Sequence, residues 1–297
     1  MLPNLESIAC FLAAARTLNF RAAAKSVHLT PTAFGKRIRQ LEELLEQPLF
    51  ERTTRNVSLT PNGEAMVPMA KRLIKTAQDC MRAGRGGGGP PPMTITIGTR
   101  YELGLSWLMP MLPALKLECP NMTINYYFGS GPDLEARIKG MDIQCAVSSR
   151  VFVDPIFEAT RLAEETYVFV AAPTLLKRVP FHDPSHAQNH CLIDAHQERP
   201  LFRYFRDASD APNELTFAST RIMGTTAAIR MLVLNGEGVA VLPYYLIKED
   251  LDTGQCVQLF PKVVLERDYF RLMYRRDDPN IEAYKALAAC IRHQPLT

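Results

Sequence analysis

The 297-residue chain contains no apolar run approaching the ~20 residues that a bilayer-spanning helix needs. Its amino terminus also lacks the basic start and apolar core of a signal peptide. These absences lead us to expect a cytoplasmic protein with no membrane partner. The hydrophobic fraction of 47% and the charged fraction of 22% are typical of globular proteins. The length favours two or three folded units.

The sequence has no Cys-x-x-Cys motif. Its seven cysteines are widely scattered and odd in number, at positions 10, 80, 119, 145, 191, 256 and 290. This pattern argues against a disulfide framework or a zinc site, so we expect free thiols in a reducing compartment. No two cysteines are close in the sequence, so the sequence offers no support for a redox switch.

Catalytic motifs are also missing, since no GxSxG, HExxH, P-loop or GxGxxG pattern occurs in the right context. The glycines of residues 84–89 precede prolines rather than a helix, so they do not form a phosphate cradle. Four histidines gather in one stretch: His182, His186, His190 and His196. Pro184 and the polar neighbours favour a surface loop over a metal site. We therefore expect no catalytic residue, metal or cofactor, and keep an enzyme as the less favoured alternative.

The most informative segment is residues 20–60, where two helical patterns joined by a tight turn precede a basic hairpin. Thr30 stands where an N-cap belongs, and Pro31 follows at the first helical position. From there apolar residues recur at helical spacing, at Ala33, Phe34, Ile38, Leu41, Leu44 and Leu45. The other face carries Thr32, Gly35, Lys36, Arg39 and Gln40. Small and polar residues followed by basic ones suit the major groove, although an ordinary amphipathic helical hairpin would show the same pattern.

The segment 49–60 favours the DNA-binding interpretation. It is apolar at both ends and polar at its centre, which predicts a hairpin with Arg52 and Arg55 near its tip. Arginines at that place can reach phosphates or a narrow minor groove. After it, Thr60 is a good N-cap, Pro61 suits the first helical position, and Glu64 suggests a capping box, so a long helix should begin there.

Charge is distributed unevenly along the chain. Residues 1–85 carry 13 Lys and Arg against 7 Asp and Glu, whereas the remainder carries 21 against 24. The basic part is therefore the part with the DNA-binding pattern, as counterion release would require.

The first 80 or so residues resemble the N-terminal domain of LysR-type transcriptional regulators. The matching residues are Phe11, Ala14, Phe20, Ala22, Ala23, Ala24, Leu29, Thr30, Ala33, Lys36, Ile38, Leu41, Glu42, Leu45, Leu49, Phe50, Arg52, Leu59, Thr60 and Gly63. The family usually has a polar residue where this chain has Pro31, and often Ser in place of Gly35. It often has Gly after the recognition helix where this chain has Glu46, which predicts a differently shaped helix end.

The resemblance implies contacts between the recognition helix, the wing and double-stranded DNA. We expect these contacts from Thr30, Pro31, Thr32, Lys36, Arg37, Arg39, Arg52, Thr53 and Arg55. Residues 1–61 would form the winged helix-turn-helix domain. A ligand-binding module with weak or no specific DNA binding is the main alternative.

Residues 62–83 form an amphipathic pattern with an apolar stripe, at Ala65, Met66, Met69, Ala70, Leu73, Ala77, Cys80 and Met81. The stripe could pack on its own domain. In the family this segment is the dimerisation helix, so we favour a homodimer or homotetramer. Pro68 lies inside the stripe and would bend the helix. The Gly- and Pro-rich residues 84–92 then predict a hinge between domains.

From Met93 onward, strand patterns alternate with helical ones, which predicts a parallel α/β sheet. Strands are expected at 93–99, 122–128, 142–148, 191–193, 215–219, 239–242, 257–260 and 269–274. The region resembles the family's effector-binding region, which is similar to periplasmic binding proteins. By this resemblance residues 93–297 form two α/β lobes, lobe I at 93–165 and 268–297 and lobe II at 166–267.

Ligands of such sheets bind beyond the carboxyl ends of strands, between the lobes. The expected effector-binding residues are Thr99, Arg100, Tyr101, Ser130, Ser149, Arg150, Thr220, Arg221 and Tyr244. Thr99 and Ser130 match the family's positions for hydroxyl contacts at helix N-termini, which favour anions. Because three of the nine residues are arginines, a small carboxylate is the expected effector, of unknown identity.

The sequence thus predicts a multi-domain protein, with an all-α winged helix-turn-helix domain, a long linker helix and a two-lobed α/β effector domain. Its expected function is sequence-specific transcription regulation controlled by a small molecule. The expected partners are operator DNA, further copies of the chain, the effector and RNA polymerase.

Overall fold

The computed structural model of the chain describes residues 2–52, 57–84, 92–212 and 215–296. The chain forms two compact units. The N-terminal unit comprises Met1–Met93 together with Ala136–Asp142, and the C-terminal unit comprises Thr94–Glu135 and Ile143–Thr297. Over the described ranges, no helix has the length and apolar character required to cross a membrane.

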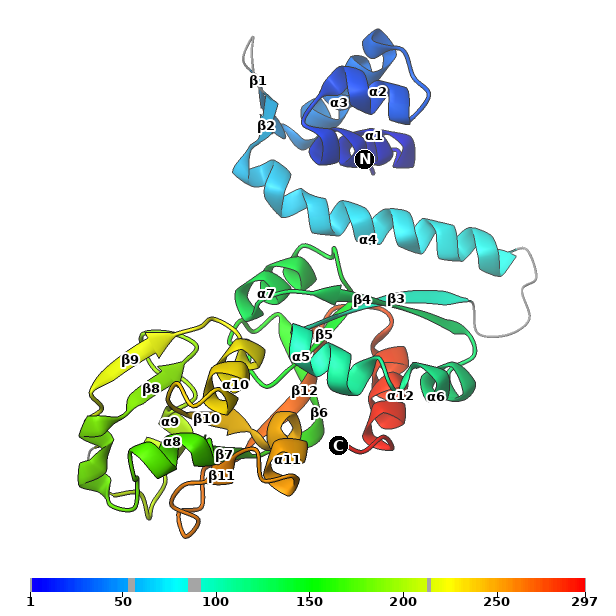
Figure 1. The fold of residues 1–297 in the computed structure, drawn as a ribbon. Coiled ribbons are helices and arrows are strands. Elements are labelled where there is room, and N and C mark those ends of the chain that lie inside the picture. Colours follow the sequence, from blue (N-terminus) through cyan, green and yellow to red (C-terminus); the bar gives the residue numbers. More distant parts are fainter. Residues whose placement is uncertain (1, 53–56, 85–91, 213–214, 297) are drawn as a thin grey trace. The chain divides into compact units, whose positions relative to one another are not determined.

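The N-terminal unit is built from helices and a short wing (Figure 1). Its elements are α1 (Leu5–Thr17), α2 (Phe20–Ser26), α3 (Pro31–Leu45), β1 (Phe50–Arg52), β2 (Val57–Leu59) and α4 (Pro61–Gly84). The strands β1 and β2 pair antiparallel, with Phe50 opposite Leu59. The helix-turn-helix and the wing are therefore both present, as the sequence predicts.

An aromatic core joins these elements. Phe34 is fully buried on the inner face of α3, and Phe11 on α1 is equally buried. The Phe20 ring meets Phe34 and Phe50 edge-on, with ring centroids 5.8 and 5.2 Å apart. Phe50 also contacts Phe11 at 5.6 Å. Edge-to-face aromatic pairs fix relative orientation, so these four rings hold α1, α2, α3 and the first wing strand together.

The start of α4 is fixed by Thr60. Its hydroxyl accepts a hydrogen bond from the Gly63 backbone N–H at 3.0 Å and donates one to the Pro48 carbonyl at 2.7 Å. Thr60 is therefore the N-cap and Pro61 the first helical residue, as expected. The predicted capping box is wrong, because the third helical position belongs to Gly63 and Glu64 is one residue too far along.

Helix α4 is continuous through Pro68, although a proline inside a helix cannot donate to the carbonyl four residues earlier. One side of α4 packs on the aromatic core through the buried Ala70 and the partly buried Met66, Val67 and Ile74. Another side leaves large apolar side chains exposed, at Met69, Leu73 and Met81.

The C-terminal unit contains two five-stranded sheets. The first has the strand order β4-β3-β5-β12-β6 and belongs to lobe I, and the second has the order β11-β7-β10-β8-β9 and belongs to lobe II. The strands of lobe I are β3 (Met93–Thr99), β4 (Met122–Phe128), β5 (Cys145–Ser148), β6 (Phe157–Glu165) and β12 (Asp268–Arg275). Those of lobe II are β7 (Tyr167–Ala171), β8 (Cys191–Asp194), β9 (Ser219–Ile222), β10 (Val239–Pro243) and β11 (Val257–Gln258).

Both sheets are mixed, so the parallel pairing that the alternation of strands and helices predicts holds for only some of the strands. β3 pairs parallel with β5, and β8 pairs parallel with β9 and β10. β12 runs antiparallel to β5 and β6, and β7 runs antiparallel to β10 and β11. The antiparallel strands include those that continue the chain between the lobes, β6 to β7, and those that return it to lobe I. A strand that arrives directly from the other lobe has no crossover helix before it. It is therefore not required to run parallel to its neighbours, as a strand after a crossover helix is.

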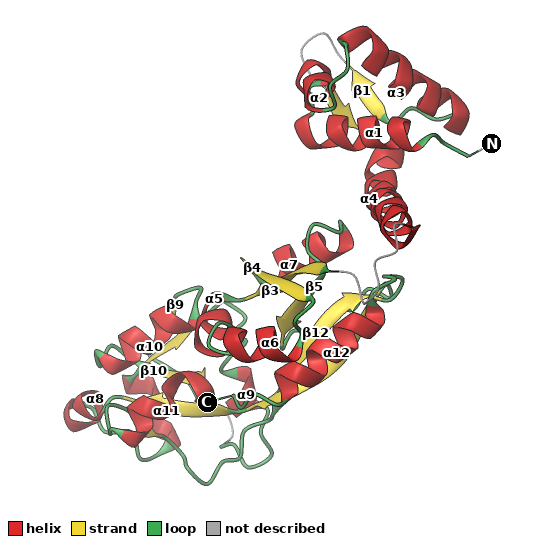
Figure 2. Ribbon diagram, turned by 90° about the vertical axis from the view of Figure 1, so that its right-hand side faces the viewer, coloured by secondary structure: helices red, strands yellow, loops and turns green. Residues whose placement is uncertain are grey.

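The helices and helical turns of lobe I are α5 (Tyr101–Leu103), the π-helical η1 (Gly104–Leu108), α6 (Leu112–Glu118), α7 (Gly131–Lys139) and α12 (Ile281–Arg292). Those of lobe II are α8 (Pro173–Arg178), the 3-10 helix η2 (Pro184–Asn189), α9 (Arg203–Arg206), α10 (Thr226–Leu234) and α11 (Tyr244–Asp252). The last helix of the chain, α12, packs beside α6 and against β6 and β12 (Figure 2).

Several expected boundaries are wrong. The strand expected at 215–219 begins only at Ser219, because pairing with β8 starts where Cys191 faces Ser219. The strand expected from residue 142 begins at Cys145. The sequence interpretation also missed β6, α8, α9 and the π-turn η1, which are short or, in β6, carry charged residues on the exposed face.

Candidate nucleic-acid interface and effector site

The tight turn between α2 and α3 places the first turn of α3 at the surface, where a recognition helix needs it. His28 adopts a left-handed conformation (φ 55°), and the Leu29 N–H donates to the Ala24 carbonyl at 2.9 Å. The Thr30 hydroxyl then accepts a hydrogen bond from the Ala33 N–H at 3.3 Å, which caps α3. The chain reverses within four residues, so the first turn of α3 stands at the surface.

The exposed face of α3 carries most of the predicted DNA-contacting residues. Thr30, Pro31, Thr32, Lys36 and Arg39 are all exposed. Gly35 lies among them, and a β-carbon built there meets no atom within 4 Å. The surface at this point is therefore open, and Lys36 and Arg39 have no acidic partner among the described residues.

Arg37 lies differently. It is only 29% exposed, and its guanidinium forms an ion pair with Glu6 on α1. Arg37 therefore ties α3 to α1, and to contact DNA it would have to leave Glu6.

Arg52, at the end of β1, is held against α3. Its guanidinium donates to the Glu42 carboxylate at 2.6 Å and lies over the Phe20 ring, 4.7 Å from the centroid. Thr53 and Arg55 of the predicted wing tip lie outside the described residues.

The C-terminal end of α3 departs from the sequence expectation. Glu46 adopts a left-handed conformation (φ 52°, ψ 26°), and its N–H bonds back to the carbonyls of Glu42 and Glu43. This is the backbone conformation that glycine adopts most easily. The expected differently shaped helix end is thus wrong, because Glu46 takes the shape that a glycine there would take.

In lobe I, the predicted effector-binding residues gather at the carboxyl ends of β3, β4 and β5. Thr99 ends β3 and is fully buried, whereas Arg100, which N-caps α5, is exposed. Ser130 precedes α7 and its hydroxyl accepts from the Asp133 N–H at 3.4 Å. Tyr101 stacks on Phe128 with ring centroids 5.3 Å apart.

Arg150 lies over the start of α7. A β-carbon built on Gly131 would meet the Arg150 Cδ atom at 3.0 Å, so the arginine chain passes directly over this glycine. The backbone of the neighbouring Ser149 is fixed by Arg271, whose guanidinium donates to the Ser149 carbonyl at 2.8 Å. Arg150 and Ser130 therefore meet at one helix N-terminus, where an anion would be stabilised.

The predicted residues of lobe II are less closely grouped. Thr220 and Arg221 lie within the edge strand β9 rather than after a strand, so the premise for choosing them is wrong. The Arg221 guanidinium pairs with Glu237 at 3.2 Å on the surface. Tyr244 begins α11, its N–H donating to the Thr166 carbonyl at 2.8 Å, and its side chain is 39% exposed.

Two acidic residues that the sequence interpretation missed lie where the lobes meet. The Glu102 carboxylate on α5 accepts the Ala227 N–H of α10 at 3.2 Å, which links lobe I to lobe II. Glu165 ends β6, is 4% exposed, and its Oε2 atom has no hydrogen-bond partner among the described residues. Burial raises the pKa of the Glu165 carboxyl to about 7, although the hydroxyls of Tyr167 and Ser149 oppose this. Their only sequence signal was proximity, because Glu102 follows Tyr101 and Glu165 precedes the crossing strand β7.

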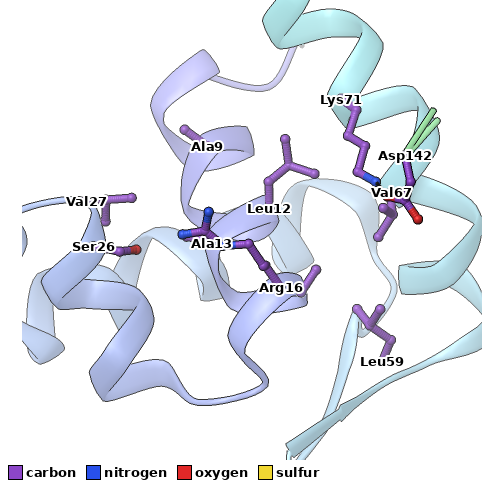
Figure 3. Close-up of a pocket in the computed structure, with 11 residues that line it drawn as sticks. Ala9, Leu12, Ala13, Arg16, Ser26, Val27, Leu59, Val67, Lys71 and Asp142 are labelled. Atoms are coloured by element: carbon purple, nitrogen blue, oxygen red, sulfur yellow. Dashed lines mark hydrogen bonds and ion pairs between the residues drawn. The ribbon is translucent and has the colours of Figure 1, made fainter. Parts of the chain in front are cut away.

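An open cavity of about 640 Å³ lies on the N-terminal unit (Figure 3). Its lining comes mainly from α1, with Val67 and Lys71 from α4, and includes Arg16 as well as the carboxylate of Asp142. None of the predicted effector-binding residues line it.

The histidine-rich stretch is only partly the surface loop that the sequence predicts, since His182 and His196 are exposed in irregular segments. Residues 184–189 form the 3-10 helix η2, and His190 is buried and stacks on Phe181 with ring centroids 4.6 Å apart. Within the ranges that the structure describes, no three His, Cys, Asp or Glu side chains are arranged to hold a metal ion.

Two cysteines that are remote in sequence meet in lobe I. The sulfur atoms of Cys119 and Cys290 lie 3.1 Å apart, and the residues are separated by 171 positions. No two cysteines are close in the sequence, but the fold brings these two side by side.

Two family models match the chain. Residues 5–64 match the bacterial regulatory helix-turn-helix protein, lysR family, and residues 88–295 match the LysR substrate binding domain. The second match alone covers more than half of the chain. The chain belongs to the LysR family of transcriptional regulators, a family of DNA-binding regulators and not of enzymes, and it combines a helix-turn-helix domain with an effector-binding domain.

Relatives of this architecture cover nearly the whole chain. The HTH-type transcriptional regulator DmlR of Escherichia coli (strain K12) is 23% identical over 268 residues, covering 88% of this chain and 85% of DmlR. The crystal structure of ArgP from Mycobacterium tuberculosis superposes with a TM-score of 0.77 at 19% identity, over 98% of both chains. Full-length LysG from Corynebacterium glutamicum, solved with bound effector Arg, gives 0.68 at 15% identity, over 98% of this chain and 99% of that one.

Proposed function

We propose that the chain reads operator DNA with the exposed face of α3 and holds the DNA backbone with the wing. The contacting residues would be Thr30, Pro31, Thr32, Lys36 and Arg39, with Arg52, Thr53 and Arg55 from the wing. The observation that carries this proposal is the exposure of Thr30, Pro31, Thr32, Lys36 and Arg39 on the first turns of α3, which the α2–α3 turn presents at the surface. Arg37 and Arg52 are engaged with Glu6 and Glu42, so their first role would be to orient α3 and β1.

The proposed domains are those that the sequence leads us to expect. Residues 1–61 form the DNA-binding domain, 62–83 the linker helix, 84–92 the hinge and 93–297 the effector domain with its two lobes. The exposed apolar side chains of Met69, Leu73 and Met81 support the role of α4 as the contact between two copies of the chain. A homodimer would place two recognition helices on two half-sites, and a homotetramer would add a second pair.

The effector is proposed to be a small carboxylate bound between lobes I and II. Arg100, Arg150 and the Ser130 end of α7 supply the anion-favouring groups, and Tyr101, Thr99 and Ser149 surround them. Tyr244 would face the effector from lobe II, with Thr220 and Arg221 farther along the edge strand. The relative LysG, which has this fold and was solved with bound effector Arg, supports effector binding by such a domain.

Effector binding would act through the Glu102–Ala227 hydrogen bond, because a ligand that stabilises one placement of the lobes shifts the population towards it. The expected output is altered spacing or bending of the bound DNA. A contact with RNA polymerase, and a cytoplasmic location, remain predictions of the same kind.

Fluorescence anisotropy with the DNA upstream of the protein's own gene tests the proposal. The full chain should bind this DNA with a steep salt dependence and should prefer it to a scrambled duplex. Equal affinity for the scrambled duplex would contradict the proposed specific DNA reading.

Calorimetric titration of the full chain with organic acids, and with the neutral amide of each acid as a matched control, tests the effector class. At least one acid should bind and its amide should not. If an amide binds and none of the acids does, the proposal that the effector is a carboxylate is wrong.

A further inference from the structure

The pair Cys119 and Cys290 is a feature of lobe I that transcription regulation does not use. Cys119 stands just after α6, where its N–H donates to the Leu115 carbonyl. Cys290 lies in the last turn of α12, which packs beside α6 (Figures 1 and 2). Their sulfur atoms are 3.1 Å apart, and no other two of the seven cysteines, all within the described ranges, approach to hydrogen-bonding distance.

The geometry favours a covalent bond between these sulfurs. A disulfide has a sulfur–sulfur distance of about 2.0 Å, so closing the gap takes a movement of roughly 1 Å. Cys119 is the C-cap of α6, and its own backbone has already left the helical conformation (φ −124°, ψ 61°). The bond could therefore form without unwinding either helix.

We propose that Cys119 and Cys290 are a modification site, at which a hydroperoxide converts the two thiols into a reversible disulfide. Cys290 is half-buried and can be reached by a small oxidant, whereas Cys119 is 8% exposed. The Cys290 sulfur attacks the peroxide O–O bond, giving a sulfenic acid and releasing water. The Cys119 sulfur then displaces the sulfenic hydroxyl as a second water, so two thiols and one hydrogen peroxide give one disulfide and two waters.

The surroundings of the pair make this reaction slow at neutral pH. Burial, the adjacent Cys119 and the Glu118 carboxylate together raise the pKa of the Cys290 thiol to about 12. Because the thiolate is the reactive form, oxidation should accelerate as pH rises. Burial is therefore the main reason that oxidation is slow, and Glu118 adds to it, so the site responds to sustained rather than brief oxidant exposure.

The disulfide would join the two separate parts of lobe I. The first part of lobe I precedes lobe II in the chain and the second part follows it, so the loop closed by residues 119 and 290 contains all of lobe II. Closing so long a loop restricts the unfolded chain strongly. Oxidation should therefore raise the melting temperature of the effector domain by roughly 5–10 °C.

Disulfide mapping of the full chain tests the site directly. Reduced protein is treated with hydrogen peroxide, alkylated with iodoacetamide, digested and analysed by mass spectrometry. The expected product is one linked peptide pair containing Cys119 and Cys290, lighter by two hydrogen atoms and separated by dithiothreitol. Full alkylation of both cysteines after oxidation, or linkage of either to another cysteine, would overturn the proposal.

Variants separate the site from general thiol oxidation. Cys119→Ala and Cys290→Ala should each abolish the rise in melting temperature, and the half-buried Cys191→Ala should retain it. Glu118→Gln should speed disulfide formation, because removing the carboxylate lowers the pKa of the Cys290 thiol, while the exposed Glu282→Gln on α12 should not. A rise in melting temperature that persists in Cys290→Ala would exclude this disulfide as its cause. If the variants fold poorly, the mapping of the unmodified chain decides alone.

Discussion

The Arg52 guanidinium of the wing donates to the Glu42 carboxylate of α3 at 2.6 Å. The other oxygen of Glu42 accepts the backbone N–H groups of Leu49 and Phe50, at 3.0 and 3.2 Å. One carboxylate thus fixes the end of α3, the loop that follows it and the first strand of the wing. Besides the aromatic core, the largely buried Glu42 side chain, only 17% exposed, therefore holds the wing against α3.

Replacing Glu42 by Ala should destabilise the N-terminal unit. Three donors lose a charged acceptor, and two of them are backbone N–H groups near the core, so we expect a loss of about 2–3 kcal/mol in the free energy of unfolding. Urea unfolding followed by circular dichroism measures it. Glu43→Ala, an exposed position on the same helix, is the control and should change the free energy by less than about 0.5 kcal/mol. Equal effects of the two substitutions would contradict this role of Glu42.

Two helical glycines should respond oppositely to alanine. A β-carbon on Gly63 would lie 2.2 Å from the Leu49 carbonyl oxygen, and this backbone atom cannot move without disturbing the wing. Gly63→Ala should therefore cost about 2 kcal/mol or more. A β-carbon on Gly35 meets open space, so Gly35→Ala should stabilise α3 by about 1 kcal/mol through its helix propensity. Thermal unfolding of both variants checks the pair, and stabilisation by Gly63→Ala would refute the close contact.

Lys36 and Arg37 are neighbours in sequence but should differ in DNA binding. Lys36 is exposed, whereas Arg37 is paired with Glu6. Lys36→Ala should weaken binding by about 1–3 kcal/mol if Lys36 reads a base, or flatten the salt dependence by about 1 if it contacts a phosphate. Arg37→Ala should retain near-normal affinity. Anisotropy titrations at several salt concentrations compare them, and an equal loss in both variants would show that Arg37 leaves Glu6 for the DNA.

Local patterns predicted the boundaries of some elements. Thr30 followed by Pro31 marked the start of α3, and strict alternation marked β3 and β4 at the residues where the structure has them. A cap or an alternating strand is decided by neighbours within a few residues, so the sequence contains the necessary information. The predicted fold class is confirmed by the two family models, which match residues 5–64 and 88–295.

Relations between distant residues were not predictable in this way. Nothing in the sequence brings Cys119 to Cys290 or buries Glu165 at the junction of the lobes, because both depend on the packing of strands that are remote in the chain. The direction of β12 is another example, since it returns from lobe II. Residues 215–218 carry a strand-like sequence but stay outside the sheet, because their register with β8 begins only at Ser219.

The end of α3 provides a test of backbone strain. Glu46 is left-handed at φ 52°, where a side chain with a β-carbon is disfavoured. Glu46→Gly should therefore stabilise the N-terminal unit by about 1 kcal/mol. Glu43→Gly, within the same helix, should instead destabilise it by about 1 kcal/mol. Urea unfolding of both variants measures the difference, and destabilisation by both would show that Glu46 carries no strain.

Glu165 should make the stability of the effector domain depend on pH. Burial raises the pKa of its carboxyl in the folded chain to about 7, from an ordinary value of 4.5. Tyr167, Ser149 and Arg100 oppose this rise, and Asp268 adds to it. The folded state therefore holds the proton more tightly than the unfolded state. The stabilising contribution is complete below pH 4.5 and is lost as pH rises through about 7, on the order of 3 kcal/mol in total.

Urea unfolding of the full chain between about pH 5 and about pH 8 measures this loss. Glu165→Gln keeps the shape of the side chain but cannot ionise, so its stability should be nearly constant over the window and should exceed that of the unmodified chain at the alkaline end. Glu164→Gln is the matched control, because Glu164 is an exposed neighbour paired with Arg267 and should leave the pH dependence unchanged. If Glu165→Gln keeps the full pH dependence, the titrating group lies elsewhere and the buried carboxyl is not responsible.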